Sequence, residues 1–542
     1  MPDPWESLQT TALLGTDRRP LPAPGPAAPY DEAVDRADPA TALLELAALE
    51  TVRRRAGALP VPAAAPADRP AAEDPRPELP APAARRLSLL LSTRGGGSGV
   101  LANVGELLPQ WLATARERGY RVPAASVPAL LDAARARSEL RPDAVALAGP
   151  LGRWLAERNA DWRFVQRAAQ DPVSAPEPAP AAASAPKPAS VPEAAPAEGD
   201  RLWHEGLFAE RVTHLTLLRR RDPAAGLALL RGTWSTERAE DRLLFLDALQ
   251  EGLSLADEPF LEAALGDRSK NVRATAAELL STLPGSALAT RMAERARTAV
   301  RLSSHGTHLL VTPPTACDPA MQRDGIPPKS PTGRGERAWW FGEVIAAAPL
   351  SVWSGHTGLT PERLLALRVG DAIDETSSTW ADDLREAWAR AAVRQQDAAW
   401  ARALLGPAPV AGPGRPARTT GAPAKLLAVL PPTERAAWTA AFIEAHGLGD
   451  AFQLLGACAT PWTPPLSTAV VEALARAAAS GAYPWSHSGV LGMTERALSP
   501  ESAGAVEALA AGASTATAWG ETFARLAGTL RFREAMLAEL AA

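Results

Sequence analysis

Residues 256–291 read ADEPFLEAALGDRSKNVRATAAELLSTLPGSALATR and carry the clearest structural signal in the chain. Asp257 is a candidate N-cap, and Pro259 suits the first turn of a helix. The apolar residues that follow recur at helical spacing on one face, at Leu261, Ala264 and Leu265. The pattern predicts a helix that begins after Asp257 and ends before the turn GDRSKN.

A second helix is predicted after that turn. Its apolar residues form a single stripe, which consists of Val272, Ala276, Leu279, Leu280 and Leu283. Pro284 and Gly285 end the pattern. A helix pair of this composition cannot bury both of its faces alone, so it must stack on neighbouring pairs. We therefore predict one unit of a HEAT-like repeat within an α-solenoid.

Two charged residues of this unit are also expected to have a structural role. Asp267 lies in the predicted turn, and Arg273 lies early in the second helix. In HEAT-like units, an Asp and an Arg at these positions commonly bridge adjacent repeats. We expect Asp267 and Arg273 to stabilise the stack together with the apolar stripe.

The composition of the whole chain favours helices. A chain of 542 residues exceeds the size of a single core, and its 46% hydrophobic content comes largely from Ala and Leu. Strand-favouring residues are scarce, with only 9 Phe and 3 Tyr. The 16 Trp residues are expected to pack as large anchors between helices. We predict an all-α fold.

Charge and cysteine content narrow the class of protein. The formal net charge of −5 provides no overall basic field that would attract nucleic acid. Only Cys317 and Cys458 are present, too few for a disulfide framework. The sequence contains no secretory signal pattern and no run of about 20 apolar residues. We expect a cytoplasmic protein.

Composition also predicts the domain organisation. Residues 1–170 are expected to form an N-terminal helical domain, interrupted by a disordered Pro/Ala-rich insert at 60–82. Residues 171–199 are predicted to be a disordered Pro/Ala linker. The HEAT-like region then spans 200–300, and a C-terminal helical-repeat region spans 301–542 with a loop at 406–423.

Four ordered strings carry a family resemblance: TALLGTDRRPLP at 11–22, LAERNADWRF at 155–164, the repeat unit above, and CDPAMQRDGI at 317–326. Together they resemble a bacterial family known only as a domain of unknown function. The resemblance implies a genomic context, because members of that family are typically encoded beside a MoxR-type AAA+ ATPase, a von Willebrand factor A-domain protein and a SWIM-type zinc-finger protein. It implies no catalytic motif.

Few residues invite a chemical interpretation. His305, His308 and Cys317 form a local group of metal-ligand types, but their spacing does not match a zinc site. The alternative is an ordered connection in which Asp318 caps a helix through Met321, and we favour it. The glycine-rich run 95–99 lacks the Lys-Ser/Thr ending of a P-loop and is interpreted as a loop.

Two runs of three arginines, at 53–55 and 219–221, invite a nucleic-acid interpretation. Each is short and lies near a predicted helix end, where cations complement the helix dipole. We expect both to form solvated surfaces.

The sequence therefore predicts a non-enzymatic helical-repeat scaffold that binds protein partners, with no catalytic, cofactor-binding or metal-binding residues. The partners implied by the resemblance are the MoxR-type ATPase and the von Willebrand A-domain protein, and no membrane or nucleic acid is expected. The alternative is a HEAT-like nucleic-acid-binding protein or DNA-repair enzyme, which requires Arg219, Arg220, Arg221, Arg231 and Arg242 to converge on one face with Trp234. A metal-dependent enzyme is a third hypothesis.

Overall fold

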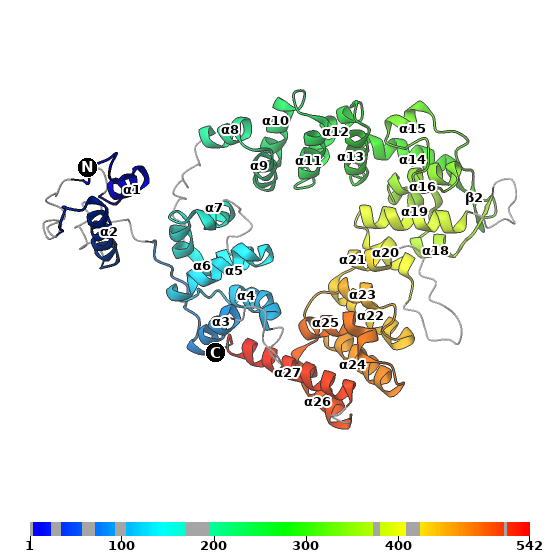
Figure 1. The fold of residues 1–542 in the computed structure, drawn as a ribbon. Helices are drawn as coiled ribbons and strands as arrows, with labels where there is room; N and C mark the ends of the chain where they lie inside the picture. The colour runs from blue at the N-terminus through cyan, green and yellow to red at the C-terminus, as the bar shows by residue number, and fades with distance from the viewer. Residues whose placement is uncertain are drawn as a thin grey trace, which may run out of the picture. The chain divides into compact units, whose positions relative to one another are not determined.

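The computed structural model describes residues 4–22, 34–56, 71–92, 104–169, 196–371, 380–407, 423–513 and 517–541. This part of the chain is predominantly helical (Figure 1). The predicted predominance of helices is therefore confirmed. Two compact units divide the chain, one at 1–71 and the other at 72–542. None of the described helices combines the length and the apolar composition needed to cross a bilayer.

The first unit contains two helices, α1 (Pro4–Leu14) and α2 (Pro39–Ala56). They share a small core, which consists of Leu8, Val34, Ala42 and Leu46. Leu13 and Leu44 remain exposed on these helices. Because so few side chains are buried, this unit contributes little apolar burial of its own.

The second unit begins with a helical module that has its own core. Its helices are α3 (Ala81–Ser92), α4 (Leu108–Glu117), α5 (Val127–Ala136), α6 (Arg141–Ala156) and α7 (Arg163–Ala169). Trp111 of α4 is fully buried in this core, as expected of a packing anchor.

Residues 71–82 are ordered, in contrast to the disordered insert predicted at 60–82. Arg76 holds them in place, because its guanidinium pairs with Asp74 at 2.7 Å and donates to the Ala146 carbonyl at 2.7 Å. Gly149 allows this close approach, since a Cβ there would lie 2.4 Å from the Asp74 carboxylate and its φ is +56°. The prediction failed here because composition does not reveal such side-chain bonds; residues 57–70 lie outside the described part.

Consecutive helices stack in the region around residues 256–291. They are α8 (Pro196–Glu205), α9 (Phe208–Arg221), α10 (Pro223–Thr233), α11 (Ala239–Ala248), α12 (Glu258–Ala264), α13 (Lys270–Ser281) and α14 (Ala287–Ala299). Helix α9 contacts α10 and α11, and α13 contacts α11, α12 and α14 (Figure 1). Helix α8 begins at Pro196, inside the predicted linker.

A small sheet departs from the predicted all-helical chain. Strand β1 (Val300–Leu302) pairs antiparallel with β2 (His308–Val311), and β2 pairs parallel with β3 (Arg368–Asp371). Val300, Leu309 and Val311 are buried in the main core. The sequence did not predict these strands, because a short apolar run has no periodicity that distinguishes a buried strand from one turn of a buried helix.

The middle of the chain adds six helices: α15 (Pro319–Arg323), α16 (Glu336–Ala347), α17 (Ser351–Thr357), α18 (Pro361–Ala366), α19 (Ala381–Arg394) and α20 (Ala398–Leu405). Helix α16 packs along α19. Trp353 and Trp388 lie 5.5 Å apart edge to face, and both are fully buried. The Thr360 side chain accepts from the Arg363 amide and caps the start of α18.

The described residues from 423 onward form the α-helices α21 (Pro423–Val429), α22 (Pro432–His446), α23 (Phe452–Gly456), α24 (Pro464–Ala479), α25 (Ser488–Ala497), α26 (Ala503–Gly512) and α27 (Ala518–Ala538). The first part of α27 packs on α26, and its far end contacts α4 in the helical module at the start of the same unit (Figure 1). Met536 and Leu540 are therefore buried in the core of that module.

Candidate functional site

The predicted stripe of the repeat unit faces the core along most of its length. Val272, Ala276 and Leu280 are fully buried, and Leu279 is 4% exposed. Leu283 differs, because α13 ends at Ser281 and leaves Leu283 half-buried beyond the helix. The stripe is therefore one turn shorter than the sequence pattern indicated.

Asp267 and Arg273 are arranged differently from the predicted bridge. The Asp267 carboxylate pairs with Arg242 of α11 and accepts from the Ser269 amide at 2.8 Å. Arg273 donates to the carbonyls of Asp267 and Arg268, at 2.7 and 3.1 Å. Asp267 thus connects α11 to the turn before α13, whereas Arg273 closes that turn within its own helix pair.

A buried ion pair connects α9 to the start of α12. Arg219 is fully buried, and both ends of its guanidinium bond Asp257, at 2.7 and 2.9 Å. The same guanidinium donates to four backbone carbonyls, those of Leu249, Glu251, Gly252 and Pro223. Arg219 therefore satisfies the carbonyls that follow α11 and neutralises a buried carboxylate.

This geometry corrects two predictions. The carboxylate of Asp257 does not cap α12 and instead bonds Arg219 and the Ser254 amide. Arg219 does not belong to a solvated basic surface, whereas its neighbour Arg220 is exposed and pairs with Glu251 at 2.8 Å. The run of three arginines gave no sign of this, because only the helix phase relative to α11 and α12 determines which arginine points inward.

Further arginine–carboxylate pairs join helices that are not consecutive in the chain. Arg291 of α14 bonds Glu262 of α12 at 3.0 Å and the buried Asp324 at 2.7 Å. Arg394 of α19 reaches back to Glu278 of α13 at 2.6 Å. These pairs stabilise the packing between helices that are separated in the sequence.

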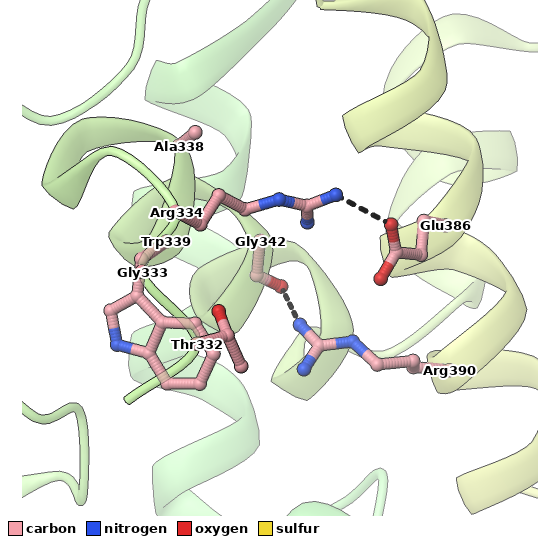
Figure 2. A pocket seen from close by; sticks show the side chains of 8 residues that line it. All are labelled: Thr332, Gly333, Arg334, Ala338, Trp339, Gly342, Glu386 and Arg390. Atoms are coloured by element: carbon pink, nitrogen blue, oxygen red, sulfur yellow. Dashed lines mark hydrogen bonds and ion pairs between the residues drawn. The ribbon is translucent and has the colours of Figure 1, made fainter. Parts of the chain in front are cut away.

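A charged cavity of about 560 Å³ lies between α16, α19 and the loop before α16 (Figure 2). Eight residues line it: Thr332, Gly333, Arg334, Ala338, Trp339, Gly342, Glu386 and Arg390. Arg334 extends from the loop across the cavity and bonds Glu386 of α19 at 2.8 Å (Figure 2). We take this cavity as the candidate site.

The second arginine of the cavity is also held in place. Arg390 bonds Glu343 at 2.6 Å. It also donates to the Gly342 carbonyl at 2.7 Å (Figure 2). The Trp339 ring completes the wall, and its buried indole N–H has no acceptor among the described residues.

The surroundings of the cavity shift the pKa values of Asp383 and Arg334. Burial raises the pKa of Asp383, although Arg334 lies 3.4 Å away and opposes the shift. The bond to Glu386 raises the pKa of Arg334. Two fixed guanidinium groups, paired carboxylates and an indole ring can recognise a polar or charged surface. Among the lining residues, Thr332 and Glu386 are of types that can act as nucleophile or proton carrier, and Glu386 is paired with Arg334.

A second cavity of about 670 Å³ follows α10 and the turn before α12. Its walls are formed mainly by Pro223, Ala224, Leu227 and Ala228, with Arg231 on the same helix. The Arg219–Asp257 pair contributes to it from the core side. The lining of this second cavity is therefore less polar than the lining of the candidate site.

The group around His305 does not form a shared site. His308 begins β2, and the Cys317 thiol lies 3.6 Å from the Ile326 carbonyl. Burial raises the pKa of Cys317. Asp318 caps α15 by accepting from the Met321 amide at 2.7 Å, which confirms the favoured alternative. Within the described part of the chain, no three His, Cys, Asp or Glu side chains are placed to hold a metal ion.

Two predictions fall outside the described residues. They concern the glycine-rich run 95–99 and the side chains of the arginines at 53–55. The predicted linker at 171–195 and most of the loop at 406–423 are also outside them.

Comparison with known proteins identifies a family. The profile of a family described as a family of unknown function (DUF5691) matches residues 7–540. No curated protein and no solved structure matches the chain.

Proposed function

The chain belongs to this family of unknown function (DUF5691), and on that premise we propose that it is a non-enzymatic scaffold of stacked helix pairs that binds protein partners. One observation carries the proposal: arginine–carboxylate pairs join helices that are not consecutive in the chain, linking α9 to the start of α12, α11 to the turn before α13, α14 to α12 and α19 to α13. A rigid stack of this kind presents preformed surfaces to other proteins, as helical-repeat proteins do.

The candidate site between α16 and α19 is the proposed contact surface. Its charges are held by side-chain pairs before any partner arrives, so little ordering entropy is lost on binding. Arginine and tryptophan are also the residue types that contribute most to protein interfaces. An acidic segment of the partner would compete with Glu386 for Arg334.

The partners implied by the family resemblance are the MoxR-type ATPase and the von Willebrand A-domain protein encoded nearby. The purified chain should bind at least one of them directly. We expect Arg334→Glu to weaken that binding, because it places a like charge beside Glu386 and Asp383. The matched control is Arg531→Glu, which changes an exposed arginine paired with Glu507 on α26. Equal loss with both variants would refute the assigned surface, and no binding of either partner would refute those partners.

Nucleic-acid binding is the alternative, and the arginine pairings argue against it. Three of the arginines it requires are paired with carboxylates: Arg219 with Asp257, Arg220 with Glu251, and Arg242 with Asp267. Phosphate contact would have to displace these partners. A mobility shift of DNA or RNA that weakens steeply with salt would restore this alternative.

A further inference from the structure

The end of α27 bridges regions that are far apart in sequence. Glu539 bonds Arg86 of α3 through two hydrogen bonds, at 2.6 and 3.0 Å. The same arginine lies 4.5 Å over the ring of Phe532. Arg118, which follows α4, donates to the Leu537 carbonyl at 3.3 Å. The C-terminal segment is thus attached to the module that begins the second unit.

The apolar face of this segment follows a simple helical pattern. Phe532, Met536 and Leu540 recur every four residues, and Met536 and Leu540 are fully buried against the module. Glu539 lies beside them and forms an ion pair with Arg86 of α3. An amphipathic helix with one acidic residue near its end is therefore bound by a surface of α3 and α4.

A buried arginine weakens the attachment. Arg533 is fully buried where α27, α4 and the residue after α25 meet. Its guanidinium donates to the Gln110 amide oxygen at 3.0 Å and to the Leu498 carbonyl at 2.6 Å, and its remaining nitrogen has no acceptor in the described structure.

The contrast with the other fully buried arginine is informative. Arg219 has a buried carboxylate and four carbonyls around its guanidinium, so every nitrogen is bonded. Arg533 has no carboxylate among its hydrogen-bond partners. Burying a cation with incomplete partners is unfavourable, whereas opening the contact returns it to water.

We propose that residues 532–540 form a reversible clasp, and that the surface of α3 and α4 beneath them is a binding site for an acidic amphipathic helix. The resident occupant is the C-terminal segment of the same chain. A partner helix with apolar residues at four-residue spacing and a carboxylate near its end takes its place when the clasp opens. This site is separate from the cavity between α16 and α19.

The test uses a labelled peptide of residues 529–541 and the full-length chain. The wild-type chain should bind it weakly because the site is occupied. Glu539→Arg places a like charge beside Arg86 and releases the clasp, so the peptide should bind that variant at least about tenfold more tightly. Arg402→Glu, which reverses an exposed arginine paired with Glu434 outside α27 and the module, should behave like the wild type.

A charge exchange tests the specificity of the site. A peptide that carries Glu539→Arg should not bind the Glu539→Arg chain but should bind a chain that carries Arg86→Glu. Equal binding of the original peptide to wild type and to the Glu539→Arg chain would overturn the proposal. Hydrogen exchange of α9–α14 serves as the folding control and should not differ among these variants.

Two measurements on the unmodified chain complete the test. Amides of residues 532–540 should exchange faster than those of α13, since the clasp opens without unfolding the helical stack. Equal protection of both would overturn reversibility. Sedimentation should give the mass of one chain at all concentrations; a dimer that dissociates in the Glu539→Arg variant would show that a second copy supplies the segment, and would overturn the intramolecular clasp.

Discussion

Removing the charge of Asp257 should destabilise the helical stack more than any surface change. Asp257→Asn keeps the size of the side chain but leaves the Arg219 guanidinium buried without a counter-charge. Breaking a buried ion pair on one side typically costs about 3–5 kcal/mol. The four carbonyl bonds of Arg219 remain, so we expect the lower end, about 3 kcal/mol.

Arg219→Met should cost at least as much, for a different reason. It leaves the buried Asp257 carboxylate without its counter-charge, and it removes the donor for three carbonyls that follow α11 and for the Pro223 carbonyl at the start of α10. Each buried group left without a partner costs about 1–3 kcal/mol. Combining Arg219→Met with Asp257→Asn should therefore recover only part of the loss, and the difference measures the coupling of the two side chains.

The assay is native-state hydrogen exchange at the amides of α9 to α13, which reports the local free energy of opening. Arg220→Met is the matched control, because its ion pair with Glu251 is exposed and worth about 0–1 kcal/mol. A cost below about 1 kcal/mol for Asp257→Asn, equal to that of the control, would refute the structural role of the pair.

Three further measurements test the core and the ionisable groups. Leu279→Ala should cost about 2–5 kcal/mol in urea unfolding, and the half-buried Leu283→Ala clearly less; equal costs would contradict the end of α13 at Ser281. A disulfide reagent should modify the half-buried Cys317 before the buried Cys458, and because burial raises both pKa values, each rate should still be rising with pH above the ordinary thiol value of 9.0; the reverse order would be inconsistent with the packing. Because the pKa of Asp383 is raised in the folded protein, the folded state binds more protons than the unfolded state, and the free energy of unfolding falls as the pH rises above 3.8. Asp383→Asn should therefore raise the melting temperature at pH 7, and this advantage should disappear below the unfolded pKa. A lower melting temperature of the variant at pH 7 would show that the ion pair with Arg334 dominates.

Local pattern was sufficient to predict much of the helix pair formed by α12 and α13. The spacing of Val272, Ala276 and Leu280 placed them correctly in the core, and Asp318 was correctly predicted to cap its helix. These features depend on residues within one or two helical turns of each other, and that information is contained in a single sequence. The helical class and the Asp318 cap therefore needed no tertiary structure, whereas the predicted Asp257 cap was wrong because a tertiary ion pair with Arg219 engages its carboxylate.

The ion pairs and the candidate site depended on tertiary contacts. Arg219 and Asp257 are 38 residues apart, Arg334 and Glu386 are 52 apart, and Arg86 and Glu539 are 453 apart. Periodicity shows which face of a helix is apolar but not which other helix covers it, so the inward arginine of a run and its carboxylate could not be identified. Only the packing of α9 on α11, of α16 on α19 and of α27 on α4 brings these charges together, because desolvation and pairing act through space and not along the chain.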